Sequence, residues 1–186
     1  MEKISTALPD VWELRPTVIR DSRGSFMETY QQQRFADLGI RDSFVQDNHS
    51  LSTKGTLRGL HFQNPHQQAK LCRVVEGEAL DVVVDVRRGS PYFGKSATVR
   101  LSAATGNQIY IPPGFAHGFL ALSNTLQFLY KCSDFYVREA ERGIAWNDPA
   151  LHIEWSIATP LLSEKDSNLP RLAEIPPEHL PVYIPR

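Results

Sequence analysis

The chain has 186 residues, a formal net charge of −1 and a hydrophobic fraction of 41%. These values suit one soluble globular domain with a sizeable core and argue against a disordered chain. No long run of one charge sign occurs, which disfavours a general nucleic-acid or membrane-surface binder but leaves room for a local basic pocket.

The first predicted element is a short helix. Thr29, with Gln32 three residues further on, has the pattern of a capping box at a helix start. An apolar stripe follows it, made by Tyr30, Phe35 and Leu38. Gly39 is the expected stop, because glycine readily adopts the left-handed conformation that ends many helices.

The middle of the chain predicts strands. LDVVVDV (80–86) and ATVRLS (97–102) alternate with a period of two. NQIYIP (107–112) and LQFLYKC (126–132) are rich in aromatic and β-branched residues. Turn signals separate these runs, and no helical pattern lies between them, so we expect an all-β antiparallel sandwich or barrel. From about Thr159 the chain turns proline-rich and charged, and we expect an extension wrapped on the barrel with a short helix.

The N-terminal stretch and the cysteines bear on the compartment. MEKISTALPDVWELRP lacks the apolar core of a signal peptide, and no run reaches the roughly 18 to 20 apolar residues of a membrane helix. Cys72 and Cys132 form no CxxC pattern. We therefore expect two reduced thiols in a cytoplasmic protein.

Polar side chains gather between apolar neighbours in six stretches. They are DSRGSFME (21–28), FVQDNHS (44–50), LRGLHFQ with the following Lys70 (57–70), IPPGFAHGF (111–119), LYKCSDFY (129–136) and LSEKD (162–166). A barrel interior can collect such positions from several strands into one cavity.

LRGLHFQ poses a specific question about Arg58 and His61. A lone His in a strand is more often half-buried against a backbone carbonyl than catalytic. A cavity with two His, an Arg and Lys70, however, suits an anionic ligand or a reaction that develops negative charge. A regular strand would point residues 58 and 61 to opposite faces. If both line one pocket, Gly59 marks a bulge between them.

A metal centre and a nucleophile are disfavoured by the motifs. A cupin-type metal site needs two imidazoles on one strand face, as in His-x-His. The six histidines, at positions 49, 61, 66, 117, 152 and 179, form no such pair, and Gln63 stands where the second ligand would lie. No Gly-x-Ser-x-Gly, P-loop or dinucleotide fingerprint occurs either.

Metal-free acid–base chemistry remains. A His paired with a carboxylate such as Asp166 makes a general base, and a Lys over a carbonyl oxygen stabilises an enolate. A tyrosine, at 130 or 136, could donate a proton from the opposite face. This is one assembly among several that the spacing allows.

LRGLHFQ, AKLCRVVEGEALDVVVDVRRGSPYFG and IPPGFAHGF together strongly resemble the dTDP-4-dehydrorhamnose 3,5-epimerase family. DSRGSFME, FVQDNHS, FLYKCSDFY, IAWNDP and LSEKD look like that family's other signatures, in the same order, from about Leu8 to Asp166. The resemblance implies a single cupin-type jelly-roll domain over 1–186, with a core of about 8–166 and an extension of about 167–186.

The resemblance also implies an activity. The family converts dTDP-4-dehydro-6-deoxy-glucose into dTDP-4-dehydro-rhamnose, without a metal or organic cofactor, as a step in nucleotide-activated rhamnose synthesis for cell-surface polysaccharide. Its members are usually homodimers whose N-terminal segments are exchanged or paired across the interface.

By the family pattern, His61 removes the protons at C3 and C5, and Asp166 orients and polarises it. Lys70 stabilises the enolate oxygen, and Tyr130 reprotonates C5 from the other face. The implied substrate-binding residues are Arg23, Phe26, Glu28, Gln46, Asn48, Arg58, His117, Tyr136, Glu141 and Lys165. The first three belong to DSRGSFME, which in the family often reaches a neighbouring subunit's nucleotide.

Two alternatives stay open. One is a relative that inverts only C3 or only C5, or that acts on another dTDP-4-keto-6-deoxysugar; Tyr130 favours double inversion. The other is a non-catalytic or metal-binding cupin such as a sugar sensor. The choice between Tyr130 and Tyr136 as donor is also open.

Overall fold

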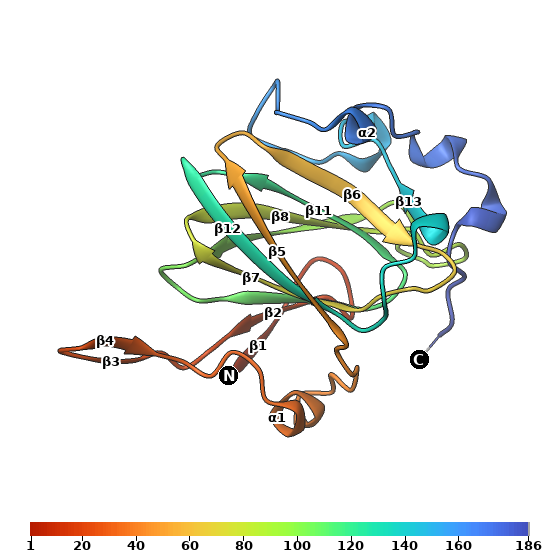
Figure 1. The fold of residues 1–186 in the computed structure, drawn as a ribbon. Helices are drawn as coiled ribbons and strands as arrows, with labels where there is room; N and C mark the ends of the chain where they lie inside the picture. Colours follow the sequence, from red (N-terminus) through yellow and green to blue (C-terminus); the bar gives the residue numbers. More distant parts are fainter. Residues whose placement is uncertain (186) are drawn as a thin grey trace.

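Two antiparallel β-sheets face each other in the computed structural model, which describes residues 1–185 (Figure 1). The strands are β1 (Glu2–Ser5), β2 (Trp12–Arg15), β3 (Ile19–Asp21), β4 (Gly24–Phe26), β5 (Gln46–Thr53), β6 (Leu57–Gln63), β7 (Lys70–Glu76), β8 (Glu78–Asp85), β9 (Ser96–Ser102), β10 (Gln108–Ile111), β11 (Phe115–Ala121), β12 (Thr125–Cys132) and β13 (Glu141–Gly143). The helices are α1 (Gln32–Asp37) and α2 (Glu164–Ser167), with short 3-10 turns at Arg138–Ala140, Pro149–Leu151, Leu172–Glu174 and Pro177–His179.

The sheet topology confirms the predicted all-β jelly-roll architecture. One sheet has the order β1-β2-β10-β7-β12-β5 and the other the order β13-β6-β11-β8-β9. The two sheets are hydrogen-bonded separately, so the barrel is not closed by a continuous ladder. The strands β3 and β4 pair only with each other, in a hairpin that projects from the body (Figure 1).

The strand β8 explains why the core has two layers. Its residues alternate between the apolar interior of the sandwich, which contains Val83, and an outer cluster, which contains Val82 and Val84. Both faces of β8 are buried, which explains why LDVVVDV carries apolar residues at all positions except Asp81 and Asp85. The predicted C-terminal extension covers the outer cluster with Leu172 and Leu180. Its last residue, Arg186, lies outside the described residues.

The helix α1 begins later than the sequence predicted. Gln31 is its N-cap, and the Gln31 Oε1 accepts a hydrogen bond from the Arg34 backbone N–H at 2.6 Å. The capping box predicted at Thr29 is therefore wrong, because Thr29 lies outside the first turn. The predicted stop is confirmed, since Gly39 follows the helix with φ of +87°. No helix within residues 1–185 is long and apolar enough to cross a membrane.

Candidate active site

The strand β6 presents Arg58 and His61 on one face. Their Cα partners on β11 are Phe119 and His117, which lie two residues apart, whereas 58 and 61 lie three apart. Directly opposed residues in an antiparallel pair share a face, so β6 accommodates one extra residue here. Gly59 occupies the bulge with φ of +121°. The predicted bulge is confirmed, and it puts both side chains on one face of β6.

His61 and Asp166 form a dyad. The His61 Nε2 lies 2.6 Å from the Asp166 Oδ1, and the Asp166 Oδ2 accepts a longer bond from the Gly59 N–H at 3.4 Å. The short helix α2 holds Asp166, which is 4% exposed, and Ser163 caps that helix. Burial alone would raise the pKa of the Asp166 carboxyl, but the hydrogen bond and charge of His61 outweigh burial and lower it. Asp166 is therefore an ionised partner for the imidazole.

A cavity of about 240 Å³ opens beside the dyad. Lys70 on β7 and Tyr130 on β12 face it from the six-stranded sheet, opposite His61 on the five-stranded sheet. The complete lining is Gln46, Asn48, His61, Phe62, Gln63, Gln68, Lys70, Tyr130, Cys132, Tyr136 and Glu141. Seven of the fourteen residues that the sequence analysis had nominated line this cavity, and an eighth, Asp166, binds His61.

The two candidate tyrosines differ in their surroundings. Burial, reinforced by the nearby cysteines, raises the pKa of the Tyr130 hydroxyl to about 12, so this hydroxyl keeps its proton at neutral pH. Within the described residues the Tyr130 hydroxyl makes no hydrogen bond. The Tyr136 hydroxyl instead donates to the Glu141 Oε2 at 3.0 Å, and Tyr136 is 52% exposed. Of these two tyrosines, only Tyr130 has a hydroxyl proton that is not committed to another described residue.

Glu141 connects the cavity to α2. Its Oε1 accepts a hydrogen bond from the Lys165 Nζ at 2.8 Å, next to Asp166 in the chain. Burial acts to raise the pKa of Glu141, but Lys165, Tyr136 and His61 together lower it. A second hollow of about 330 Å³ adjoins the other side of His61 and is lined in part by Glu141 and Lys165. His61 and Glu141 therefore line both hollows, and Lys165 lines only the second.

Arg58 is not among the residues that line the cavity. Its Nε donates to the Ser52 Oγ at 3.1 Å and its Nη2 to the Leu51 carbonyl at 3.3 Å. The Arg58 charge acts to lower the pKa of Tyr130, against the larger effect of burial. Arg58 is thus a positive charge held by two hydrogen bonds.

Seven nominated residues do not line the cavity, and three of these belong to the N-terminal stretch DSRGSFME. Arg23 pairs with Asp21 at 2.6 Å, and Phe26 is 69% exposed, both on the projecting β3–β4 hairpin. Glu28 pairs with Arg34 at 3.0 Å. The resemblance placed this stretch at a neighbouring subunit, so the binding role of these residues stays a prediction.

Comparison of the sequence with known proteins shows which family the chain belongs to. A sequence model described as dTDP-4-dehydrorhamnose 3,5-epimerase matches residues 5–174. The chain belongs to this family. A family member from Shigella flexneri, a dTDP-4-dehydrorhamnose 3,5-epimerase, is 52% identical over 170 residues, which covers 90% of this chain and 94% of the relative.

Two solved structures are similar to this epimerase-family chain. The first is dTDP-6-deoxy-D-glucose-3,5-epimerase from Legionella pneumophila in complex with dTDP-4-keto-L-rhamnose, with a TM-score of 0.97, 45% identity and 99% of each chain covered. The second is a 3'-monoepimerase from Streptomyces bikiniensis in complex with dTDP-quinovose, with a TM-score of 0.88, 35% identity and coverage of 95% and 91%.

Sequence reasoning missed two buried polar residues of this family member. Gln63 fixes the loop after β12, because its Oε1 accepts from the Val137 N–H at 2.7 Å and its Nε2 donates to the Phe135 carbonyl at 3.2 Å. Asp81 is fully buried and binds His117, with 2.8 Å between the Asp81 Oδ2 and the His117 Nε2. A carboxylate inside a valine run was the available signal for Asp81. His117 is buried, is not among the residues that line the cavity, and is the direct cross-strand partner of His61.

Proposed function

We propose that this chain epimerises dTDP-4-dehydro-6-deoxy-glucose at C3 and C5 to give dTDP-4-dehydro-rhamnose. The observation that carries the proposal is the His61–Asp166 dyad, which faces Lys70 and Tyr130 across one cavity. The ketone at C4 acidifies the protons at C3 and C5, so a base on one side and an acid on the other invert each centre through an enolate. The names of the 52%-identical relative and of the 45%-identical solved structure agree with this chemistry.

His61 is the proposed base. Its Nε2 is committed to Asp166, which leaves Nδ1 to take the substrate proton. The ionised Asp166 fixes this tautomer and stabilises the imidazolium that forms. Lys70 then supplies a positive charge for the enolate oxygen at C4. These groups supply the acid–base chemistry without a cofactor.

Tyr130 is the proposed acid for C5. Inversion needs a proton from the face opposite the base, since a single group acting from one face would restore the starting centre. Tyr130 lies on the opposite sheet from His61 and keeps its proton at neutral pH. The Tyr136 hydroxyl is already committed to Glu141, which favours a binding role for it.

The remaining nominated residues, apart from the buried His117, are proposed to bind the nucleotide. Arg58 suits a diphosphate, because a guanidinium can bind phosphate oxygens with two donors. We also propose a homodimer in which the β3–β4 hairpin, with Arg23, Phe26 and Glu28, reaches the partner's cavity. The exposed Ile19 and Phe26 on that hairpin support this proposal, because large apolar side chains exposed to water on an isolated hairpin are stabilised when a partner chain buries them. A cytoplasmic site of action follows from the nucleotide-sugar substrate.

We infer in addition that residues 1–186 act as one unit. Asp166 comes from the C-terminal part, and Leu172 and Leu180 beyond it pack on the outer cluster. Removal of that part would strip the dyad of its carboxylate.

Deuterium exchange tests the reaction. The protein is incubated in deuterated water with dTDP-4-dehydro-6-deoxy-glucose, and NMR should show label at both C3 and C5. Label at C3 alone would indicate a monoepimerase, like the 35%-identical relative. Label at neither carbon would refute epimerisation of this substrate.

A further inference from the structure

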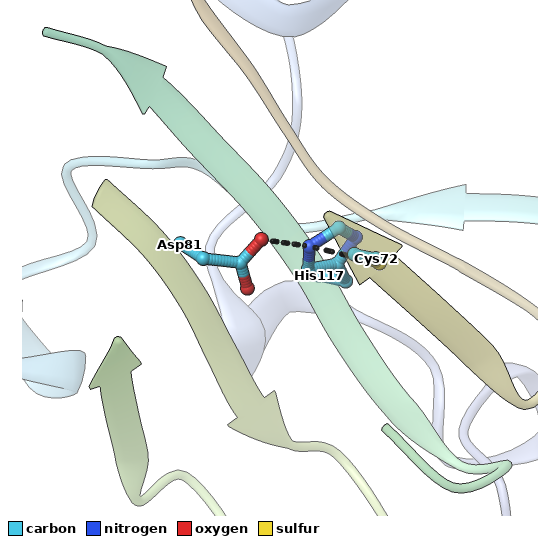
Figure 2. Close-up of side chains that lie close together, drawn as sticks. All are labelled: Cys72, Asp81 and His117. Carbon is cyan, nitrogen blue, oxygen red and sulfur yellow. Dashed lines mark hydrogen bonds and ion pairs between the residues drawn. The ribbon is translucent and has the colours of Figure 1, made fainter. Parts of the chain in front are cut away.

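A second cluster of reactive side chains lies beneath the proposed active site. Figure 2 shows Cys72 from β7, Asp81 from β8 and His117 from β11 converging between the two sheets. The His117 Nε2 lies 2.8 Å from the Asp81 Oδ2 and 4.0 Å from the Cys72 Sγ. All three residues are buried, and their possible ligand atoms lie within 4.8 Å of one another.

The hydrogen bonding of this cluster is incomplete. The Asp81 Oδ1 is buried and has no hydrogen-bond partner in the described part of the chain. A buried carboxylate oxygen without a partner is costly, and such groups are rare in native proteins. The Cys72 Sγ lies 4.0 Å from the His117 Nε2, and because a thiol is a weak donor, its hydrogen bond to His117 is weak. The Asp81 Oδ1 and the Cys72 Sγ are therefore available as ligands for a metal ion.

We propose that Cys72, Asp81 and His117 bind a zinc ion that inhibits the enzyme. Thiolate, carboxylate and imidazole are the side-chain ligand types of zinc. Zinc bonds of about 2.0 Å to N or O and about 2.3 Å to S place tetrahedral ligands about 3 to 4 Å apart, close to the spacing seen here. The thiolate and carboxylate would together balance the charge of the ion. A fourth position remains for water.

Three features oppose the ion and make its binding reversible. Burial, followed by the Asp81 charge, raises the pKa of the Cys72 thiol, so an entering cation must displace a proton. Lys70, two residues before Cys72 on the same strand face, repels a cation. The His117 Nε2 must also exchange its hydrogen bond to Asp81 for the metal.

Inhibition follows from position. His117 is the direct cross-strand partner of His61, and Cys72 is that of Tyr130. Because the thiol proton leaves as the ion enters, the net charge of the cluster would change from −1 to 0, one unit more positive next to both the proposed base and the proposed acid. It would also link the two sheets, because Cys72 belongs to one sheet and the other two ligands to the other.

Cobalt binding tests the site independently of catalysis. The metal-free protein is titrated with Co²⁺, and a thiolate-to-cobalt charge-transfer band in the near ultraviolet should rise to one equivalent and disappear when Zn²⁺ is added. The Cys72→Ser variant should lose the band and bind Zn²⁺ at least about 100-fold more weakly. Cys132→Ser, the matched control, should keep both, because Cys132 is also buried but lies outside the cluster.

The outcomes separate this inference from the proposed reaction. A wild-type protein without the band, or a band that survives in Cys72→Ser, would overturn the site. If Cys72→Ser does not fold, as judged by circular dichroism, Asp81→Asn replaces it and should weaken zinc binding similarly. The rate of deuterium exchange with zinc is divided by the rate without zinc for each protein. This ratio should fall below one in wild type and in Cys132→Ser, and should stay near one in Cys72→Ser and Asp81→Asn. A failure of the deuterium test would leave the cobalt result unaffected.

Discussion

Replacement of Tyr130 by Phe tests the two-sided mechanism most directly. The change removes one hydroxyl that has no hydrogen-bond partner within residues 1–185 and keeps a ring that packs on the apolar core. No polar group loses a hydrogen-bond partner in this variant, so the free energy of unfolding should change by no more than about 0.5 kcal/mol. The loss should fall on chemistry alone.

The expected catalytic loss is specific to one carbon. A positioned general acid contributes about 10²- to 10⁴-fold, or about 2.7 to 5.4 kcal/mol of barrier. Tyr130→Phe should therefore slow inversion at C5 by that factor. Proton removal at C3 by His61 does not need the tyrosine, so solvent deuterium should still enter C3 at nearly the wild-type rate.

Time-resolved NMR in deuterated water measures both rates in one sample. Tyr136→Phe is the matched control, because it removes the same atom from a ring that lies in the same cavity lining. It should preserve C5 inversion and affect mainly KM, since its hydroxyl bonds Glu141. Equal losses at C3 and C5 in Tyr130→Phe, or a larger C5 loss in Tyr136→Phe, would refute the assignment of the acid.

Three further predictions concern the dyad and the bulge. Asp166→Asn should lower kcat by about 10²- to 10⁴-fold in the exchange assay, because an amide cannot stabilise the imidazolium; unchanged kcat would contradict the dyad. The pKa of Asp166 is lowered by folding, so its stabilising effect is complete above the ordinary Asp pKa and is lost as pH falls through the lowered folded value. Thermal melts at several pH values should show that the melting temperature falls less steeply with decreasing pH in Asp166→Asn than in wild type. The same pH dependence in both proteins would count against the ion pair. Gly59→Ala should destabilise by at least about 2 kcal/mol, because φ is +121° and a Cβ would lie 2.6 Å from the Gly118 Cα. Gly24→Ala, with φ of +132° and open space around it, should cost less in the same denaturant titration.

The strands and the bulge were predictable because they depend on local patterns. LRGLHFQ was expected as a strand, and β6 covers the same residues. Gly59 followed from parity, since only an extra residue brings 58 and 61 to one face. These inferences use spacing within one segment, which a sequence displays directly.

Features that depend on pairing between distant segments were not predictable in the same way. The cap at Gln31 in place of Thr29 depends on where the chain leaves the sheet. The cluster of Cys72, Asp81 and His117 depends on the register of three strands in two sheets, which the spacing within one segment does not display. Family signatures nominated His117 but said nothing of its two buried partners.

The sandwich itself accounts for the proposed inversion. Facing sheets pack about 10 Å apart, a gap that holds a sugar ring with one face toward each sheet. His61 projects from the five-stranded sheet and Tyr130 from the six-stranded sheet, so the base and the acid oppose each other without any loop movement. The carboxylate of the proposed dyad comes from neither sheet, because Asp166 lies in α2, at the end of the domain core. We therefore propose that the chain from α2 onward orients the base as well as covering the outer cluster. The two sheets alone would hold the proposed acid without an oriented base.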